Sequence, residues 1–144
     1  MDKLECAIVL HFGDNAHMSH ALAHRATVEE HQVAGLKLML DSPLAELLVA
    51  ELGGRPVGVC GLQLLVSTAQ GAYSCHVEDL VLAPECRGRG IGRLLLEAAA
   101  EWAQRRGATR MQLNCDDKNL PAMKFYESLG WRKTHLFNYF KLDF

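Results

Sequence analysis

The sequence of 144 residues predicts one α+β domain, covering residues 1–144, in which helices flank a mixed β-sheet. Two observations support this fold class. A Gly/Pro cluster over residues 52–56 separates two β-rich runs, which predicts an antiparallel hairpin. A strand over 73–82, a helix over 94–106 and a strand over 110–115 form one strand-helix-strand unit, which predicts a right-handed parallel crossover.

The N-terminal part is expected to contribute one strand and two helices. The strand covers residues 4–11, and the first helix, over 14–25, starts at a cap-type Asp or Asn. Thr27 and Glu30 have the spacing of a capping box and open the second helix. An Asp-Ser-Pro segment ends that helix after residue 40.

The hairpin strands are expected over 47–51 and 57–66. Near the C-terminus, Asn119 is a cap-type residue before a helix with one apolar face, and Gly130 closes that helix. Residues 131–144 are expected to form one or two final strands. The whole pattern gives a mixed, mostly antiparallel sheet flanked by about four helices.

Composition excludes several functional classes. The chain has 15 Lys and Arg against 17 Asp and Glu, a net charge of −2, whereas proteins that cover nucleic-acid phosphates are strongly basic. No signal-peptide pattern or apolar stretch of membrane-spanning length is present. Five cysteines without a C-x-x-C pair indicate neither a disulfide framework nor a zinc cluster. We therefore expect a soluble, cytoplasmic protein with a small-molecule partner, no nucleic acid and no membrane.

A glycine loop lies between the predicted strand over 73–82 and the following helix. Residues 87–92 read Arg-Gly-Arg-Gly-Ile-Gly and are followed by Arg93. Glycines allow a close backbone approach, and the free N–H groups of a helix N-terminus attract phosphate. A Walker A loop would need Gly-Lys-Ser/Thr, and a dinucleotide loop would need G-x-G-x-x-G; neither spacing is present. A simple tight turn is the structural alternative.

The loop matches the Q/R-x-x-G-x-G/A signature of the GNAT superfamily of acetyl-CoA-dependent N-acetyltransferases. The block Glu-Asp-Leu-Val-Leu-Ala-Pro over 78–84 before it, and Asn119 with Phe-Tyr-Glu-Ser-Leu-Gly-Trp over 125–131 after it, also resemble that family. The resemblance covers residues 47–131. It implies a GNAT-like sheet with a splayed central parallel pair, acetyl-CoA as cosubstrate, and a homodimer.

The resemblance also implies which residues hold acetyl-CoA. The pyrophosphate would rest on the glycine loop, and the pantetheine arm would pair with the strand before it, where splayed strands leave N–H and C=O groups for its amides. The expected cofactor-binding residues are Leu80, Val81, Leu82, Arg87, Gly88, Arg89, Gly90, Ile91, Gly92, Arg93 and Asn119.

Acetyl transfer to an amine needs a base and a proton donor for the thiolate. Glu78 is the first candidate base, because strand alternation places it on one face with Leu80, whereas Asp79 points to the other face unless a bulge reassigns them. Tyr126 matches the family's general acid. The alternatives are a solvated strand carboxylate for Glu78 and a packing residue on an apolar helix face for Tyr126.

Two other chemistries are weighed and set aside. An acetyl-cysteine intermediate would need a Cys/His/Asn arrangement that the sequence does not display. His17, His20, His24 and His31 have helical spacing, but no carboxylate or cysteine completes a ligand set, so no metal is expected. These histidines border the family's acceptor pocket and are candidates for shaping substrate choice.

The sequence therefore predicts transfer of an acetyl group to a primary amine of a small cationic acceptor by direct attack in a ternary complex. The motifs lie nearest to small-amine and diamine acetyltransferases, and acidic residues at 78–79 and 116–117 would attract the cation. Asn114 stands where the ribosomal-alanine branch carries a glutamate. The alternatives are a protein N-terminal or lysine acetyltransferase and a non-catalytic acyl-CoA-binding module.

Overall fold

The computed structural model describes residues 8–12 and 30–142. The chain divides into two compact units, Met1–Asn114 and Cys115–Phe144, which are described separately. Within the described ranges, no helix is long and apolar enough to cross a membrane.

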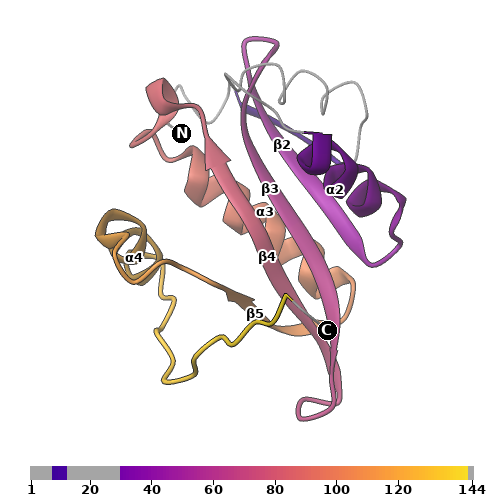
Figure 1. Cartoon of the computed structure of the whole chain (residues 1–144). Helices are drawn as coiled ribbons and strands as arrows, with labels where there is room; N and C mark the ends of the chain where they lie inside the picture. The colour runs from indigo at the N-terminus through magenta and orange to yellow at the C-terminus, as the bar shows by residue number, and fades with distance from the viewer. Residues whose placement is uncertain (1–7, 13–29, 143–144) are drawn as a thin grey trace. The chain divides into compact units, whose positions relative to one another are not determined.

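A single five-stranded sheet organises the first unit (Figure 1). Its strands lie side by side in chain order: β1 (Ile8–Phe12), β2 (Ala45–Leu52), β3 (Arg55–Ser67), β4 (Ala72–Leu82) and β5 (Ala108–Leu113). The first four strands are antiparallel, and β5 runs parallel to β4. The predicted hairpin is β2–β3, and its turn is tight because Gly53 and Gly54 adopt φ of 59° and 76°.

Helices cover both faces of this sheet. In Figure 1, α2 (Glu30–Asp41) lies in front of the sheet and α3 (Ile91–Arg105) lies behind it. Met39 of α2 packs with Leu47 and Val49 of β2 in one apolar cluster. On the other face, α3 packs against strands β2 to β5. The connection from β4 through α3 to β5 is the predicted crossover.

The second unit contains α4 (Leu120–Ser128), which begins where the sequence predicts. The Asn119 side chain caps it by accepting a hydrogen bond from the N–H of Ala122 at 3.2 Å. The prediction of strands over 131–144 is wrong for residues 131–142, which carry neither helix nor strand. Apolar, β-prone side chains favour a strand only when a neighbouring strand pairs with it, and residues 131–142 have no such partner within the described chain.

Three further expectations change. The described ranges contain three α-helices and one 3₁₀ helix, η1 (Pro84–Cys86), and the helix expected over 14–25 lies outside them. The mixed, mostly antiparallel sheet is confirmed, but its parallel pair lies at one end of the described sheet, not at its centre. The reason is that no strand of the described chain follows on the far side of β5. The α3 helix also begins at Ile91, three residues before its predicted start.

Candidate functional site

A β-bulge interrupts β4 at Glu78. Asp79 is paired with Gly61 of β3, and Val77 is paired with the next residue, Leu62, so Glu78 is an extra residue without an opposite partner. Bulges bend a strand and re-aim side chains, and they occur often beside active sites. The strand alternation that the sequence suggests therefore fails at this residue.

The bulge places both acidic side chains on one face of the sheet. His76 is paired with Gln63 and Asp79 with Gly61, which are two residues apart on β3, so His76 and Asp79 share a face. Glu78 lies on that face as well, because its Oε2 atom is 3.2 Å from Nε2 of His76.

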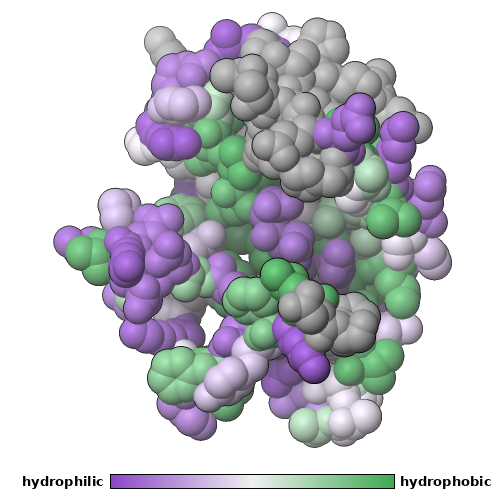
Figure 2. Space-filling model, viewed as in Figure 1, coloured by the Kyte–Doolittle hydropathy of each residue, from purple (hydrophilic) through white to green (hydrophobic). Residues whose placement is uncertain are grey.

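This is the face that α2 covers in part. A Cβ atom added to Gly61 would lie 3.1 Å from Cε of Met39 in α2. Both acidic residues are exposed. In Figure 2 a group of hydrophilic side chains interrupts the hydrophobic surface over the middle of β3 and β4. The bulge therefore presents two carboxylates side by side to solvent.

Beyond the bulge, β4 separates from β5. The parallel pairing runs from Tyr73 opposite Ala108 to Val77 opposite Leu113 and stops there, while β4 continues to Leu82. Residues 79–82 keep their β3 partners on one side. Because successive residues of a strand direct their N–H and C=O groups to opposite neighbours, part of this backbone is left for another extended molecule. β4 therefore extends past the end of its pairing with β5 over residues 78–82.

The glycine loop follows the end of β4 and leads into α3. Gly88 and Gly90 adopt φ of 70° and 84°, in the left-handed region that favours glycine. Gly90 is the N-cap residue of α3 and offers no side chain to cap the first N–H groups. The guanidinium-bearing residues Arg87 and Arg89 are exposed beside it. These features fit a bound phosphate group.

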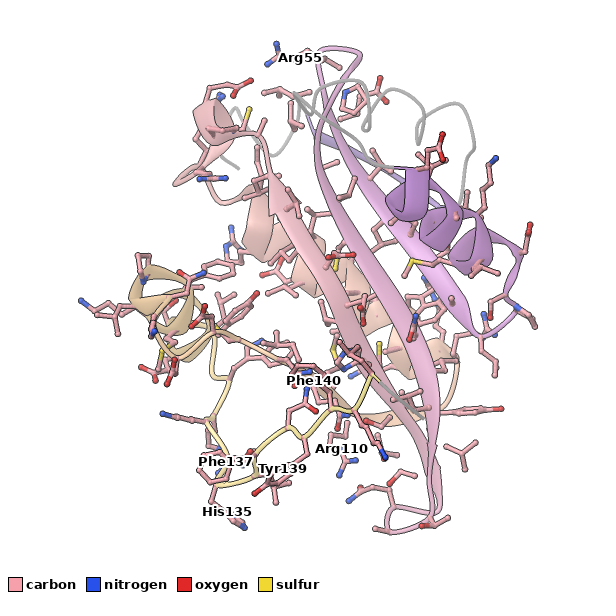
Figure 3. The ribbon with its side chains drawn as sticks, in the orientation of Figure 1. Arg55, Arg110, His135, Phe137, Tyr139 and Phe140 are labelled. Carbon is pink, nitrogen blue, oxygen red and sulfur yellow. The ribbon has the colours of Figure 1, made fainter. Side chains whose placement is uncertain are left out.

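Buried and paired residues hold this loop in place. Cys86 and Ile91, on either side of it, are 2% and 0% exposed. Arg55, labelled in Figure 3, lies 3.2 Å from Glu85 of η1. Arg93 shares its positive charge with an acidic residue of the helix, because its Nη1 atom lies 2.8 Å from Oε1 of Glu97 one helical turn later.

Two expected site residues lie in the second unit. The Oδ1 atom of Asn119 caps α4, so its structural role is established independently of any cofactor. The ring of Tyr126 contacts two aromatic rings in tilted geometry, with centroid distances of 5.3 Å to Phe125 and 5.8 Å to Trp131. The Tyr126 side chain is partly buried, so packing holds its ring while part of the residue stays accessible to solvent.

The histidines and the buried cysteines also bear on the candidate site. The contact of His76 with Glu78 was not predicted, although the position of His76 two residues earlier on the strand is a usable signal. The four histidines with helical spacing lie where no side chain is described. Burial raises the pKa of Cys60 to about 12 and that of Cys75 to about 11, so neither forms a ready nucleophilic thiolate.

The end of β4 beyond its pairing with β5, a glycine loop leading into a helix and an acidic bulge thus follow one another along the chain of an α/β protein. The family model described as "Acetyltransferase (GNAT) family" matches residues 16–131 of the chain. The chain belongs to this family, which confirms the resemblance in its sequence motifs.

Two relatives with curated names each match 64% of the chain. One is a "Putative [ribosomal protein bS18]-alanine N-acetyltransferase" of Bacillus subtilis, 30% identical over 92 residues, which are 64% of this chain and 57% of that protein. Another is a thialysine N-epsilon-acetyltransferase of Sus scrofa, 32% identical over 99 residues, which are 64% and 58% of the two chains. The match thus spans little more than half the length of these relatives.

A solved structure supports the fold. The aminoglycoside N-acetyltransferase AAC(6')-Iy in complex with CoA superposes with a TM-score of 0.82 over 94% of this chain and 95% of that chain, at 16% identity. At this identity the likeness concerns the fold alone. It confirms the mixed α/β GNAT fold.

Proposed function

We propose that this protein is an acetyl-CoA-dependent N-acetyltransferase that acts on a primary amine of a small cationic molecule. The observation that carries the proposal is the arrangement along β4: an acidic bulge at residues 78–79, an unpaired backbone edge to residue 82, and the glycine loop directly after it. A base, a site for an extended arm and a phosphate site thus follow one another within 15 residues.

The unpaired edge and the loop are proposed to hold acetyl-CoA. Backbone groups over 80–82 pair with the amides of the pantetheine arm, as a missing strand would. The N–H groups at the start of α3 and the exposed Arg87 and Arg89 bind the pyrophosphate. Arg93 contributes less directly, because Glu97 already neutralises part of its charge.

Glu78 is proposed to accept a proton from the amine, directly or through water. The neutral nitrogen then attacks the acetyl carbonyl carbon, so that a C–N bond forms and the C–S bond breaks. A backbone N–H near Leu80 stabilises the carbonyl oxygen as it gains charge. Tyr126 donates its phenolic proton to the departing thiolate, and Asn119 contacts the cofactor arm. The nitrogen loses its second proton through water to the Tyr126 phenolate, and Glu78 releases its proton to solvent, so the products are an acetamide and the CoA thiol.

A cationic acceptor fits the charges on the bulge. Glu78 and Asp79 lie on one face and no lysine or arginine of the described chain is ion-paired with either of them, so an ammonium group would be attracted there. The substrates in the names of a relative and of a structural neighbour support this class of acceptor, since thialysine and aminoglycosides are amines.

Acetylation of a protein N-terminus is the second candidate. It is favoured by the similarity to the putative ribosomal-alanine acetyltransferase of Bacillus subtilis. Against it, Asn114 directly follows β5 where that branch carries a glutamate, so the base would come from β4 instead. A non-catalytic acyl-CoA-binding module would bind the cosubstrate without turnover.

A panel of amines with a thiol-release readout tests the proposal. Diamines, polyamines and aminoglycosides are compared with a peptide bearing a free N-terminal alanine and with a lysine peptide, at saturating acetyl-CoA. We expect the highest kcat/KM with a small cationic amine. Turnover confined to the peptides would favour the second candidate, and tight acetyl-CoA binding with no turnover of any amine would contradict an enzyme.

Tyr126→Phe tests the proposed proton donor separately. The substitution keeps the aromatic stack with Phe125 and Trp131 and removes only the hydroxyl. We expect kcat to fall about 10- to 100-fold with unchanged acetyl-CoA affinity, which is the size of a general-acid contribution. Phe125→Leu is the matched packing control. Full activity of Tyr126→Phe would assign the tyrosine to packing.

We also propose a cytoplasmic homodimer. The segment after α4 supports the dimer, because this segment carries large apolar side chains that are each at least 75% exposed: Leu136, Phe137, Tyr139, Phe140 and Leu142. Phe137, Tyr139 and Phe140 are labelled in Figure 3. Such a stretch is unusual on a monomer. Light scattering tests the assembly: the wild type should have twice the monomer mass and Phe137→Glu should be monomeric, whereas a wild-type monomer would contradict it.

A further inference from the structure

His76 and Glu78 form a pair on the exposed face of β4. Their Nε2 and Oε2 atoms are 3.2 Å apart. The two side chains differ in exposure, since 17% of the His76 side chain and 50% of the Glu78 side chain are accessible. His76 is therefore the more buried member of the pair and Glu78 the more exposed one.

The other ring nitrogen of His76 makes no hydrogen bond within the described chain. Its Nδ1 atom is buried and has no hydrogen-bond partner in the described part of the chain. A neutral imidazole carries one proton, and a carboxylate can only accept. The contact with Glu78 therefore favours the proton on Nε2, which makes His76 a donor aimed at the carboxylate.

A hydrogen-bond partner matters more for the orientation of the Glu78 side chain than for that of a residue in a regular strand. It is the extra residue of the bulge, so no side chain stands opposite it on β3. A glutamate has three side-chain torsions, and fixing a long side chain costs conformational entropy. Asp79 beside it carries a like charge on the same face, which pushes the carboxylate away from its neighbour. Within the described chain, the His76 ring gives the Glu78 carboxylate a partner at a fixed place.

We propose that His76 is a positioning residue that holds the Glu78 carboxylate in the orientation from which it accepts the proton of the amine. The inference rests on the proposed function of Glu78 as base. His76 itself exchanges no proton with substrate in this scheme. Its ring is packed into the sheet and orients Glu78 before the acceptor binds, which removes a reorganisation step from the reaction.

Two substitutions at residue 76 separate positioning from packing. His76→Leu fills the space without a donor, while His76→Gln keeps an N–H donor near the place of Nε2. We expect His76→Leu to lower kcat about 10-fold, because a misplaced base is inefficient, and to leave the KM for acetyl-CoA unchanged. His76→Gln should recover kcat to within about 3-fold of the wild type. Equal losses in both variants would indicate packing and overturn the proposal.

A double-mutant cycle shows whether His76 acts through Glu78. In a Glu78→Gln background, His76→Leu should lower kcat by less than about 2-fold, because the base that it orients is already gone. Losses that multiply would mean independent roles and overturn the proposal. Asp79→Asn provides the control background, in which the full effect of His76→Leu should persist.

A spectroscopic readout makes the test independent of turnover. In protein labelled with ¹⁵N-histidine, the His76 ring should show the tautomer protonated at Nε2, and Glu78→Gln should change its ¹⁵N shifts while Asp79→Asn leaves them nearly unchanged. A wild-type ring protonated at Nδ1 only would overturn the pairing. If His76→Leu kept full turnover while Glu78→Gln lost it, the role of His76 would be overturned and that of Glu78 would stand. Absence of thiol release from the wild type with every amine would instead contradict the proposed function, and the role of His76 with it.

Discussion

Glu78 and Asp79 are neighbours in the sequence and lie on the same face of the sheet, because β4 bulges at Glu78. In a regular strand they would point to opposite faces. The bulge thus concentrates two negative charges at the point where β4 leaves β5. This single irregularity brings a candidate base and a cation-attracting group to the place where the backbone is free to bind an extended molecule.

Substitution of Gly90 tests the phosphate site. Gly90→Ala places a Cβ on a residue with φ of 84° at the start of α3, where the backbone would approach the pyrophosphate. We expect the affinity for acetyl-CoA, measured by calorimetry, to fall about 10-fold, because the methyl group blocks that close approach.

Gly107→Ala is the matched control for this substitution. Gly107 has φ of 85°, follows the other end of α3, and has no atom within 4 Å of an added Cβ. Both alanines therefore impose a similar backbone strain, on the order of 1–2 kcal/mol. If Gly107→Ala weakened acetyl-CoA binding as much as Gly90→Ala, the effect would be one of stability and the loop assignment would be wrong.

Gly58 tests the packing of the sheet against α3. An added Cβ would lie 2.6 Å from Cδ2 of Leu82 and 3.2 Å from Cδ1 of Leu95, so the Leu82 side chain must shift and the Leu95 side chain must give way slightly. We expect Gly58→Ala to lower the free energy of unfolding by about 1–3 kcal/mol in a urea titration. Gly35→Ala in α2, where nothing lies within 4 Å, should instead raise it by about 0.5–1 kcal/mol. A neutral Gly58→Ala would refute the close packing.

The cysteines should differ in reactivity. Burial, with smaller contributions from Cys75 and Asp79, raises the pKa of Cys60 to about 12, and burial raises that of Cys75 to about 11. Cys115 is exposed. At pH 8 a thiol reagent should label Cys115 quickly and reach Cys60 and Cys75 only on unfolding. Peptide mapping measures this, and fast labelling of Cys60 in the folded protein would contradict it.

The same pKa shifts predict a loss of stability in alkali. The unfolded thiols release protons above their ordinary pKa of 9.0, whereas the folded thiols keep theirs. Their contribution to stability is therefore complete below pH 9 and is lost as the pH rises toward 11 and 12. Urea midpoints at pH 8 and pH 10.5 measure it. Cys60→Ala should reduce the dependence, and an unchanged dependence would place its origin elsewhere.

Local signals explain what could be predicted from the sequence. The hairpin turn at Gly53 and Gly54, the cap at Asn119 and the glycine loop are set by residues close together in the chain, and each lies where the sequence predicts. The order of strand, helix and strand likewise fixes the parallel pair.

Features that depend on pairing between distant residues were harder to predict. The bulge follows from the register of β4 against β3, so alternation along β4 alone cannot place it. The anchor at His76 depends on that bulge. Residues 131–142 have an apolar, β-prone composition but no strand to pair with in the described chain, so composition alone predicted strands there wrongly.

The rate of thiol release by Glu78→Gln, compared with Asp79→Asn, tests the central claim most directly. Both substitutions remove one negative charge from the same face and keep the size of the side chain. With the best amine at saturating acetyl-CoA, we expect Glu78→Gln to lower kcat about 100-fold or more, as loss of a general base does, and Asp79→Asn to raise mainly the KM for the amine. Equal kcat values for the two variants would contradict the assignment of Glu78 as the base.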